Sequence, residues 1–252
     1  MTFMEKLKHS SQVNRSLVCV GLDPERTKLP ECVREKEHAL FEFNRAIIDA
    51  TADWVCAYKP QAAYYAGQNA DEDLKLTIDY IHERAPEIPV ILDVKRGDIG
   101  STATMYAKEA FERYNADAVT VNPYMGFDTL KPFHDHADKG VIILCRTSNP
   151  NSGDLQNLVC GGKMVYEHVA LLARDRWNYN GNAALVIGAT YPEELRHVRE
   201  LCPDMPFLVP GVGAQGGDVE KVVKFGCDRT GHGIVINSSR GIIYADKTEN
   251  FA

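Results

Sequence analysis

Eight short apolar runs recur along the chain, and longer segments with helical spacing lie between them. Several of these runs are continuously apolar, which is typical of strands buried on both faces of a parallel sheet. The segments 40–52 and 101–114 repeat apolar side chains at the spacing of the buried face of a helix. The eight predicted strands lie at 17–22, 54–58, 90–95, 118–122, 141–146, 184–189, 207–212 and 233–237.

Boundary residues predict two further helices. Thr190, placed before a proline and a glutamate, indicates the N-cap of a helix over 193–201. Asp218 can cap another helix over 219–225, and Gly226 suits its C-terminal end. Each predicted helix therefore follows a predicted strand.

This alternation predicts the fold class. Eight strand–helix units in 252 residues give about 31 residues per unit, which suits an α/β fold of the (β/α)₈ TIM-barrel type. A doubly wound open sheet is the competing arrangement. No linker, repeat or low-complexity tract divides the chain. We therefore expect a single domain over 1–252, with 1–16 as an N-terminal helical extension.

Net charge, hydropathy and cysteine content argue against a nucleic-acid-binding, membrane-spanning or secreted protein. The formal net charge is −7 without a cluster of lysine and arginine, so nucleic acid is not an expected partner. No apolar run approaches ~18 residues, so no membrane span is expected. The first residues alternate charges and lack the apolar stretch of a signal peptide. The seven cysteines form no Cys-x-x-Cys pair, which favours a reducing cytoplasm.

Three ionisable residues follow the third apolar run. Asp93, Lys95 and Asp98 lie within six positions of one another. A strand with a period of two places Asp93 and Lys95 on one face, side by side. Burying a carboxylate and an ammonium is costly unless they are paired, so this strand end suggests a site. An ion pair that only closes the end of a strand is the alternative interpretation.

Polar residues also follow most of the other predicted strands. In α/β barrels the active site is built from residues at the carboxyl ends of the strands. Any one of these residues could be an ordinary loop residue, but their shared position favours a common site. Besides Asp93 and Lys95, they are Asp23, Lys59, the segment 146–148, Gln215 and the segment 238–240.

The loop after the seventh strand contains a Gly-x-Gly-x-x-Gly pattern at 211–216. It is a weak dinucleotide fingerprint, because it lies late in the chain and the expected acidic residue does not follow. Glycines still let backbone N–H groups approach a phosphate, and barrels commonly bind phosphate after strands seven and eight. Arg240 adds a fork of donors suited to phosphate oxygens. A tight turn with a surface arginine is the alternative.

Other candidate motifs are weaker. The sequence 134–136, His-Asp-His, could suggest a metal site, but residues two apart on a helix face different ways. No strand end offers a convincing set of His and carboxylate ligands, so a catalytic metal is not expected. No Gly-x-Ser-x-Gly nucleophile motif is present.

The segment 93–102, read as DVKRGDIGST, resembles the Asp-x-Lys-x-x-Asp-Ile-x-x-Thr signature of the orotidine 5′-monophosphate decarboxylase family. The similarity extends over about residues 17 to 244 and is typical of the bacterial branch. Arg96 and Gly97 occupy the variable pair of the signature and receive no role. Other blocks of the family occur in the same order at 20–24, 58–60, 147–150, 210–215 and 239–242.

The resemblance implies a function and a set of roles. The enzyme would decarboxylate orotidine 5′-monophosphate (OMP) to UMP, the last step of de novo pyrimidine synthesis, without metal or organic cofactor. Lys95 would stabilise and protonate a carbanion at C6 of the pyrimidine. The implied catalytic charges are Lys59, Asp93, Lys95 and Asp98.

The same resemblance implies substrate contacts and a partner. Asp98, Ile99 and Thr102 would enter the site of a second subunit, which implies a homodimer with two shared active sites. Two loops, 149–153 and 210–217, would close over the nucleotide. The ribose contacts would be Asp23 and Lys59, the pyrimidine contact Ser148, and the contacts around the phosphate Pro210, Gln215 and Arg240.

Two other functions remain open from the sequence. A Mg²⁺-dependent sugar-phosphate decarboxylase of the same barrel superfamily uses the same Asp-x-Lys-x-x-Asp element. Lys59 and the block around Ser148 favour the nucleotide enzyme over it. A non-catalytic nucleotide-binding barrel is the other alternative. The costly charge cluster speaks against it, because binding alone does not require such a cluster.

Overall fold

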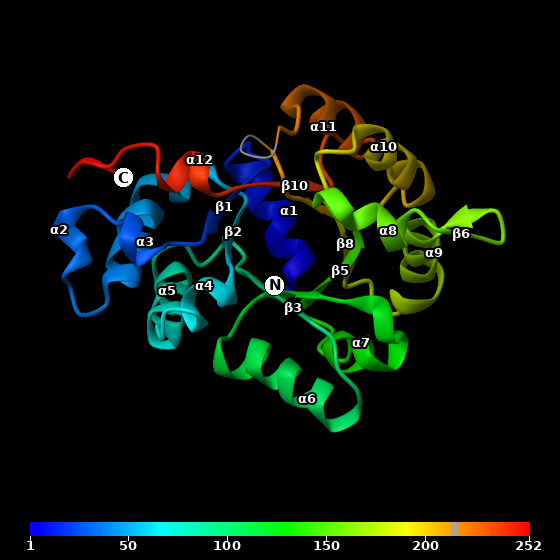
Figure 1. Ribbon diagram of the computed structural model, residues 1–252, viewed down its shortest axis with the longest axis horizontal. Helices are drawn as coiled ribbons and strands as arrows, with labels where there is room; N and C mark the ends of the chain where they lie inside the picture. The colour runs from blue at the N-terminus through cyan, green and yellow to red at the C-terminus, as the bar shows by residue number, and fades with distance from the viewer. Residues whose placement is uncertain (213–215) are drawn as a thin grey trace.

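The computed structural model describes residues 1–212 and 216–252, and its centre is a barrel of eight parallel strands (Figure 1). The hydrogen-bonded order of the strands is β2-β1-β10-β9-β8-β5-β4-β3. Bridges from Tyr58 to Val90 and from Gln61 to Asp93 join β2 to β3 and close the sheet. This closure confirms the TIM barrel and excludes the open sheet. The strands are β1 Val18–Leu22, β2 Ala57–Pro60, β3 Ile91–Arg96, β4 Ala118–Val121, β5 Gly140–Arg146, β8 Ala183–Ile187, β9 Phe207–Val209 and β10 Ile234–Ser238.

Helices lie around the barrel between successive strands (Figure 1). The stripe predicted over 40–52 is α3, and the stripe over 101–114 is α6 followed by a π-helical turn at Glu109–Arg113. The helices are α1 Phe3–Val13, α2 Glu31–Arg34, α3 Ala39–Thr51, α4 Ala62–Ala66, α5 Asp71–Arg84, α6 Gly100–Lys108, α7 Phe127–His134, α8 Gly153–Gln156, α9 Val165–Leu172, α10 Pro192–Leu201, α11 Val219–Gly226 and α12 Arg240–Ile243. Among the described residues, no helix is long and apolar enough to cross a membrane.

One predicted helix boundary is confirmed and one is wrong. The Asp218 carboxylate accepts a hydrogen bond from the Lys221 N–H at 3.2 Å and caps α11 as expected. The residue at the N-cap of α10 is Tyr191 and not Thr190. The Thr190 hydroxyl instead donates to the carbonyl of Ser148 at 3.3 Å. A longer-range hydrogen bond thus replaces the local cap that the sequence suggested.

The strands are apolar on both faces because each face packs against a different cluster. The outward faces pack with the surrounding helices in one large core. A second, smaller cluster takes one or two residues from every barrel strand, together with Phe3 and Leu7 of α1. Gly140, at the start of β5, leaves room for Phe3, because a Cβ there would lie 2.2 Å from the Phe3 ring.

Helix α1 is held at the amino ends of the strands by polar contacts as well. The Thr2 hydroxyl and the Glu5 carboxylate form a capping box at its start. The Lys6 ammonium lies 2.9 Å from Asp117, just before β4. His82 contacts the other Asp117 oxygen at 3.0 Å, and the Val90 N–H donates to that oxygen at 2.9 Å. Asp117 therefore connects α1, α5 and the segment before β3.

We expect Asp117→Asn to lower the free energy of unfolding in a pH-dependent way. Burial alone would raise the pKa of Asp117, but hydrogen bonds from His82 and Val90 and the charge of Lys6 lower it to about 2 from 3.8. A depressed pKa stabilises the fold fully above the unfolded value and loses that effect as the pH falls towards the folded value. The shift corresponds to about 2 kcal/mol near neutral pH.

Urea unfolding of both proteins at several pH values measures this effect. The difference between wild type and Asp117→Asn should begin to shrink below about pH 4. Asp53→Asn, at an exposed carboxylate before β2, is the matched control and should change the unfolding free energy little. A difference that stayed constant with pH would show that the Asp117 charge is not the source of the stability.

Candidate active site

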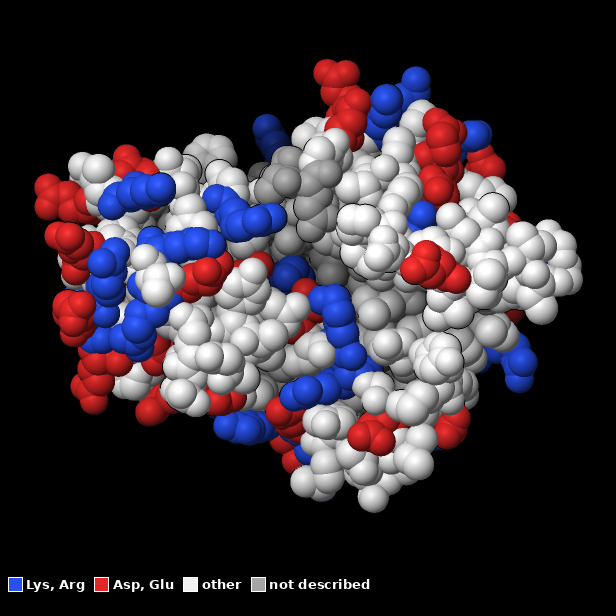
Figure 2. Space-filling model, viewed as in Figure 1, with Lys and Arg blue, Asp and Glu red and all other residues white. Residues whose placement is uncertain are grey.

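Polar side chains collect at the end of the barrel where the eight strands terminate. Strand β2 carries Lys59, β3 carries Asp93 and Lys95, and Asp23 directly follows β1. Because parallel strands end at the same rim, residues far apart in sequence become neighbours there. Basic and acidic side chains meet in a hollow near the middle of the face drawn in Figure 2.

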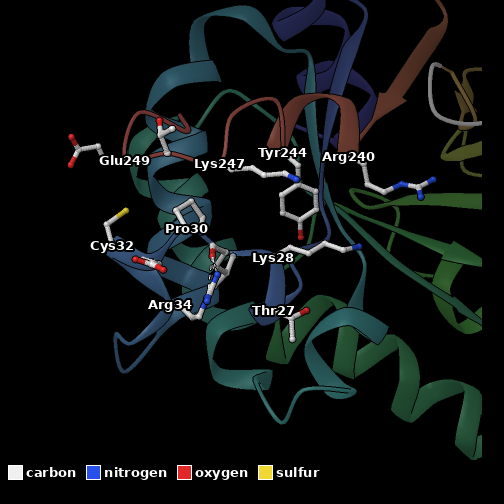
Figure 3. Close-up of a pocket in the computed structure, with 12 residues that line it drawn as sticks. Thr27, Lys28, Pro30, Cys32, Arg34, Arg240, Tyr244, Lys247 and Glu249 are labelled. Atoms are coloured by element: carbon white, nitrogen blue, oxygen red, sulfur yellow. Dashed lines mark hydrogen bonds between the residues drawn. The ribbon is translucent and has the colours of Figure 1, made fainter.

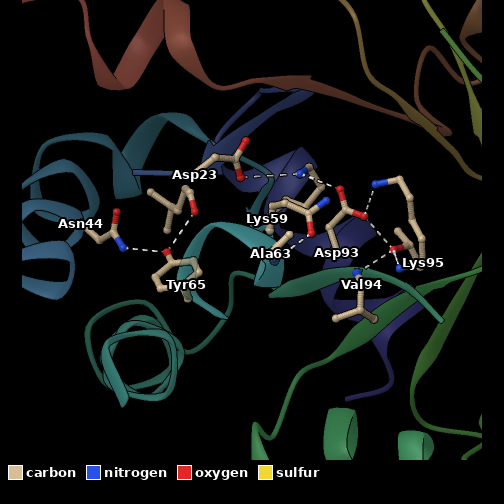
Figure 4. A network of polar contacts seen from close by, with 11 residues as sticks. Asp23, Asn44, Lys59, Ala63, Tyr65, Asp93, Val94 and Lys95 are labelled. Carbon is tan, nitrogen blue, oxygen red and sulfur yellow. Dashed lines mark hydrogen bonds and ion pairs between the residues drawn. The ribbon is translucent and has the colours of Figure 1, made fainter. Parts of the chain in front are cut away.

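Four of the predicted site residues form a chain of alternating charges (Figure 4). The Lys59 ammonium lies 3.0 Å from Asp93 Oδ2 and 4.0 Å from Asp23 Oδ1. The Lys95 ammonium lies 2.6 Å from Asp93 Oδ1. The side chains of Lys59 and Asp93 are less than 10% exposed, whereas that of Lys95 is 46% exposed. The outer lysine is thus the member of the chain that is open to a ligand.

Burial and neighbouring charges act in opposite directions on the two buried members. Burial alone would lower the pKa of Lys59, but the charges of Asp93 and Asp23 raise it above its ordinary value. Burial would raise the pKa of Asp93, but Lys59 and Lys95 hold it well below its usual range. Both groups are therefore ionised at neutral pH, and each buried charge has a partner of opposite sign.

The backbone at Lys95 departs from a regular strand. Lys95 has φ = 50°, in the left-handed region that side chains other than glycine rarely adopt. The pairing of β3 with β4 shifts register between Leu92 and Arg96. The expected contact between Asp93 and Lys95 is confirmed, but a regular period of two is the wrong reason for it. The Lys95 ammonium and the Asp93 carboxylate are therefore brought together by an irregular strand end.

Asp98, Ile99 and Thr102 are not brought to this charge chain within a single copy of the protein. The Asp98 carboxylate accepts a hydrogen bond from the Ile99 N–H at 2.8 Å, and among the described residues no cation pairs with it. The Ile99 side chain is 61% exposed. Thr102 is exposed on the first turn of α6. Ile99 and Thr102 are thus exposed beyond β3, and Asp98 is half-buried there.

The segment after β5 approaches the segment after β8 closely. Gly188 follows β8, and a Cβ there would lie 2.8 Å from the Cα and Cβ of Ser148. The hydroxyl of Thr190 donates to the carbonyl of Ser148. Ser148 is therefore held at the rim of the barrel by the neighbouring loop, and glycine at 188 is required for the approach.

The predicted phosphate residues lie after β9 and β10. The Pro210 carbonyl accepts a hydrogen bond from the Ala189 N–H at 2.8 Å, and Gln215 lies outside the described residues. Arg240 begins α12 with an exposed side chain and borders a groove of about 980 Å³ (Figure 3). In Figure 3 the Lys28 and Arg240 side chains extend in the same direction on either side of Tyr244. The Lys28 ammonium and the Arg240 guanidinium thus lie beside the strand ends.

One carboxylate oxygen of Asp23 faces the Lys59 ammonium at 4.0 Å. Its Oδ1 is buried and, among the described residues, makes no hydrogen bond. Hydrogen bonds hold Leu22, the residue before Asp23, in place. The Tyr65 hydroxyl donates to the Leu22 carbonyl at 2.9 Å and accepts from Asn44 at 2.8 Å (Figure 4). A buried acceptor without a hydrogen-bond donor costs free energy, and the nearby charge of Lys59 offsets part of that cost.

Sequence reasoning gave no individual role to Arg146, which is fully buried at the end of β5. Its guanidinium donates to Ser152 and Gln156 in the following loop, and it lies 3.8 Å from the centre of the Tyr191 ring. Gln156 in turn accepts from the Thr147 N–H at 2.9 Å. Arg146 thereby ties the loop that carries Ser148 to the start of α10. An arginine that ends a buried strand is the signal that could have identified it.

The His-Asp-His sequence does not form a cluster. His134 is buried, with Nδ1 2.9 Å from Asn182 Oδ1, whereas the His136 ring packs against Phe111. Within the described ranges, no group of three or more His, Cys, Asp or Glu side chains is arranged to hold a metal ion.

Comparisons with known proteins agree over the whole chain. The model of the family described as "Orotidine 5'-phosphate decarboxylase / HUMPS family" matches residues 16–252. The orotidine 5′-phosphate decarboxylase of Ralstonia pickettii is 58% identical over 252 residues, which cover 100% of this chain and 93% of the relative. The solved OMP decarboxylase of Leishmania donovani is 40% identical with a TM-score of 0.87, over 100% of this chain and 94% of that one. The UMP synthase of the same organism is 43% identical with a TM-score of 0.88, over 96% of this chain and 52% of that one.

Proposed function

The chain belongs to the orotidine 5′-phosphate decarboxylase / HUMPS family, and we propose that it converts OMP to UMP without a metal or organic cofactor. The family and the full-length match to curated decarboxylases support decarboxylation of OMP as its reaction. This reaction would complete de novo pyrimidine synthesis. All seven cysteines are free thiols, which supports the reducing cytoplasm as its location.

The observation that carries the proposal is the alternating chain Asp23–Lys59–Asp93–Lys95 at the strand ends. Its inner charges are buried and paired, and its outer ammonium is half exposed. Binding alone does not require buried charges, because a few hydrogen-bond donors hold an anion at lower cost. A fixed ammonium beside a carboxylate is suited to a reaction in which negative charge moves within the substrate.

In the proposed mechanism, the C6–carboxylate bond of OMP breaks and its electron pair remains on C6 as CO₂ leaves. The Lys95 ammonium lies against this carbon, stabilises the developing carbanion and then transfers a proton to it, which gives UMP. Asp93 holds Lys95 in place and lies beside the departing carboxylate. Lys59 keeps Asp93 ionised, since its charge lowers the pKa of that carboxyl.

Magnitudes decide which of these effects dominates. Two like charges about 4 Å apart repel by roughly 4 kcal/mol at an effective dielectric constant near 20. Enzymatic accelerations require on the order of 8–23 kcal/mol. Repulsion between Asp93 and the substrate carboxylate therefore supplies the smaller part. Preorganised stabilisation of the carbanion by Lys95 supplies more, and it strengthens when water is excluded.

The remaining predicted residues would position the nucleotide. Asp23, whose Oδ1 accepts no hydrogen bond among the described residues, and the Lys59 ammonium beside it would contact the ribose hydroxyls. Ser148 would contact the pyrimidine from the rim after β5. Arg240, together with Pro210 and Gln215, would hold the phosphate, and this remote binding energy can drive closure over the reacting carbon.

A homodimer with shared sites explains why Asp98, Ile99 and Thr102 lie outside the charge chain of their own subunit. Asp98 forms no ion pair with its own charge chain among the described residues and Ile99 is exposed, yet both belong to the same signature as Lys95. Exposed apolar side chains gather on the same part of the chain, at Ile99 and Met105 after β3 and at Tyr124 and Met125 after β4. Such apolar exposure is typical of an interface. Asp98, Ile99 and Thr102 would thus complete the site of the partner subunit.

The loss of OMP absorbance on mixing with purified protein in excess EDTA tests the proposed function. We expect rapid conversion to UMP, because Lys95 supplies the positive charge that a metal ion would otherwise provide. OMP without protein is the control. No conversion of OMP, with activity that appears on adding Mg²⁺ and a sugar phosphate, would overturn the proposal in favour of a metal-dependent relative.

A further inference from the structure

The hydroxyl of Thr120 lies at the centre of the irregular end of β3. Thr120 is on β4 and is 1% exposed. Its Oγ1 accepts hydrogen bonds from the N–H groups of Val94 and Lys95, each at 3.0 Å. The same hydroxyl donates to Asp93 Oδ1 at 2.8 Å. One side chain therefore contacts three consecutive residues of β3.

These three hydrogen bonds fix the direction of the hydroxyl. A threonine hydroxyl has one proton to donate and two lone pairs to accept. Both N–H groups can only donate, and the Asp93 carboxylate, held ionised by Lys59 and Lys95, can only accept. The proton of Thr120 must therefore point at Asp93. The full capacity of the hydroxyl is used, which leaves it a single orientation.

The same contacts replace the regular pairing of strands at this point. The β3–β4 register shifts between Leu92 and Arg96, and the N–H groups of Val94 and Lys95 bond to the Thr120 side chain. Lys95 is thereby held at φ = 50°, a conformation that costs free energy in a residue with a Cβ. Such strain persists only where surrounding contacts maintain it.

We propose that Thr120 is a positioning residue for the decarboxylation, and this inference rests on the proposed function. It acts through Asp93 and Lys95. Its donated hydrogen bond sets the rotation of the Asp93 carboxylate, and its two accepted bonds set the backbone from which the Lys95 ammonium reaches Asp93 Oδ1. The Lys59 ammonium holds only the other oxygen, Oδ2. Without Thr120, the Lys95 ammonium loses its fixed place against the substrate C6.

Thr120→Val tests the proposal, because valine keeps the shape and the β-branch of threonine and removes the hydroxyl. We expect kcat for OMP to fall by about 10- to 100-fold, because the variant loses hydrogen bonds to a charged carboxylate and to a strained backbone segment. KM should change by less than about threefold, because Thr120 bonds only to Asp93, Val94 and Lys95, none of which is proposed to hold the ribose or the phosphate. Thr120→Ser keeps the hydroxyl and should restore kcat to within about threefold of wild type.

A matched control is Thr129→Val in α7. The Thr129 side chain is also buried, and its hydroxyl donates to the Gly126 carbonyl at 2.7 Å, away from the charge chain. This variant should lose some thermal stability and keep kcat. Amide hydrogen exchange gives a readout independent of activity: the Val94 and Lys95 amides should exchange faster in Thr120→Val and not in Thr129→Val.

The outcomes separate this inference from the proposed function. If the wild-type protein does not decarboxylate OMP, the proposed function is wrong, and the exchange rates alone then report whether Thr120 holds the strand end. If the wild type is active and a folded Thr120→Val keeps its kcat, Thr120 is not a positioning residue. A loss of kcat in both Thr120→Val and Thr120→Ser would also overturn the proposal, because the hydroxyl would not be the group that matters.

Discussion

Replacement of Lys95 by alanine is expected to lower the turnover of OMP on the order of 10⁴-fold or more, because one group supplies both the electrostatic stabilisation and the proton. The ammonium lies 2.6 Å from Asp93 and is the exposed member of the charge chain. After the substitution, Asp93 remains paired with Lys59 at 3.0 Å. The buried carboxylate therefore keeps one cation, and we expect the barrel to fold.

Single-turnover kinetics and the binding of UMP separate chemistry from recognition in this variant. UMP should bind Lys95→Ala with an affinity close to that of wild type, since its ribose and phosphate would contact other residues. Lys108→Ala, at an exposed lysine at the end of α6, is the matched control and should keep full turnover. Substantial turnover by Lys95→Ala would show that another group protonates C6.

Mixed dimers of two inactive chains are expected to regain activity. Lys95→Ala and Asp98→Ala should each abolish turnover alone. In a heterodimer, the site with an intact Lys95 receives an intact Asp98 from the other subunit, while the second site lacks both. Random assembly of equal amounts should give about a quarter of the wild-type activity, because half of the dimers are mixed and each has one working site.

The control mixture combines Lys95→Ala with Lys59→Ala. Both lysines belong to the charge chain of one subunit, so every site in this mixture lacks one of them and no activity should return. Activity can be followed after the two chains are unfolded together and refolded. Absence of rescue in the mixture of Lys95→Ala and Asp98→Ala would show that Asp98 does not act across an interface.

The barrel and the core of its site could be predicted because they depend on repeated, local patterns. Continuous apolar runs identify strands buried on both faces, and polar residues that end them meet at one rim. The contact between Asp93 and Lys95 is confirmed at 2.6 Å, although the strand end that holds it is irregular. The signature that begins at Asp93 also led to the family, which the full-length comparisons confirm.

Features that depend on contacts between distant segments could not be predicted. Thr120 lies inside an apolar run, where a threonine is equally typical of an ordinary strand, and its bonds to β3 become visible only when the two strands pair. The positive φ of Lys95 has no sequence signal, since glycine is the residue expected there. The residue type and the neighbours of Thr190 are typical of an N-cap, but its hydroxyl donates to the Ser148 carbonyl instead.

A short hairpin was also missed. Strands β6, Val159–Cys160, and β7, Lys163–Met164, pair antiparallel around Gly161 and Gly162. Both glycines have positive φ, the conformation that a tight two-residue hairpin turn requires. The Gly-Gly pair is a known turn signal, but the flanking strands are too short and too exposed to stand out by their apolar pattern.

The position of α1 has a consequence for the order in which the chain folds. This helix is synthesised first, yet its Phe3 and Leu7 belong to a cluster that includes residues from all eight barrel strands. Its Ser11 contacts His232 across 221 positions of sequence. Contacts of such separation require the closure of very long loops, which slows their formation. We therefore expect α1 to dock on the barrel only after the last strand has left the ribosome. The segment made first is among the last to reach its native place.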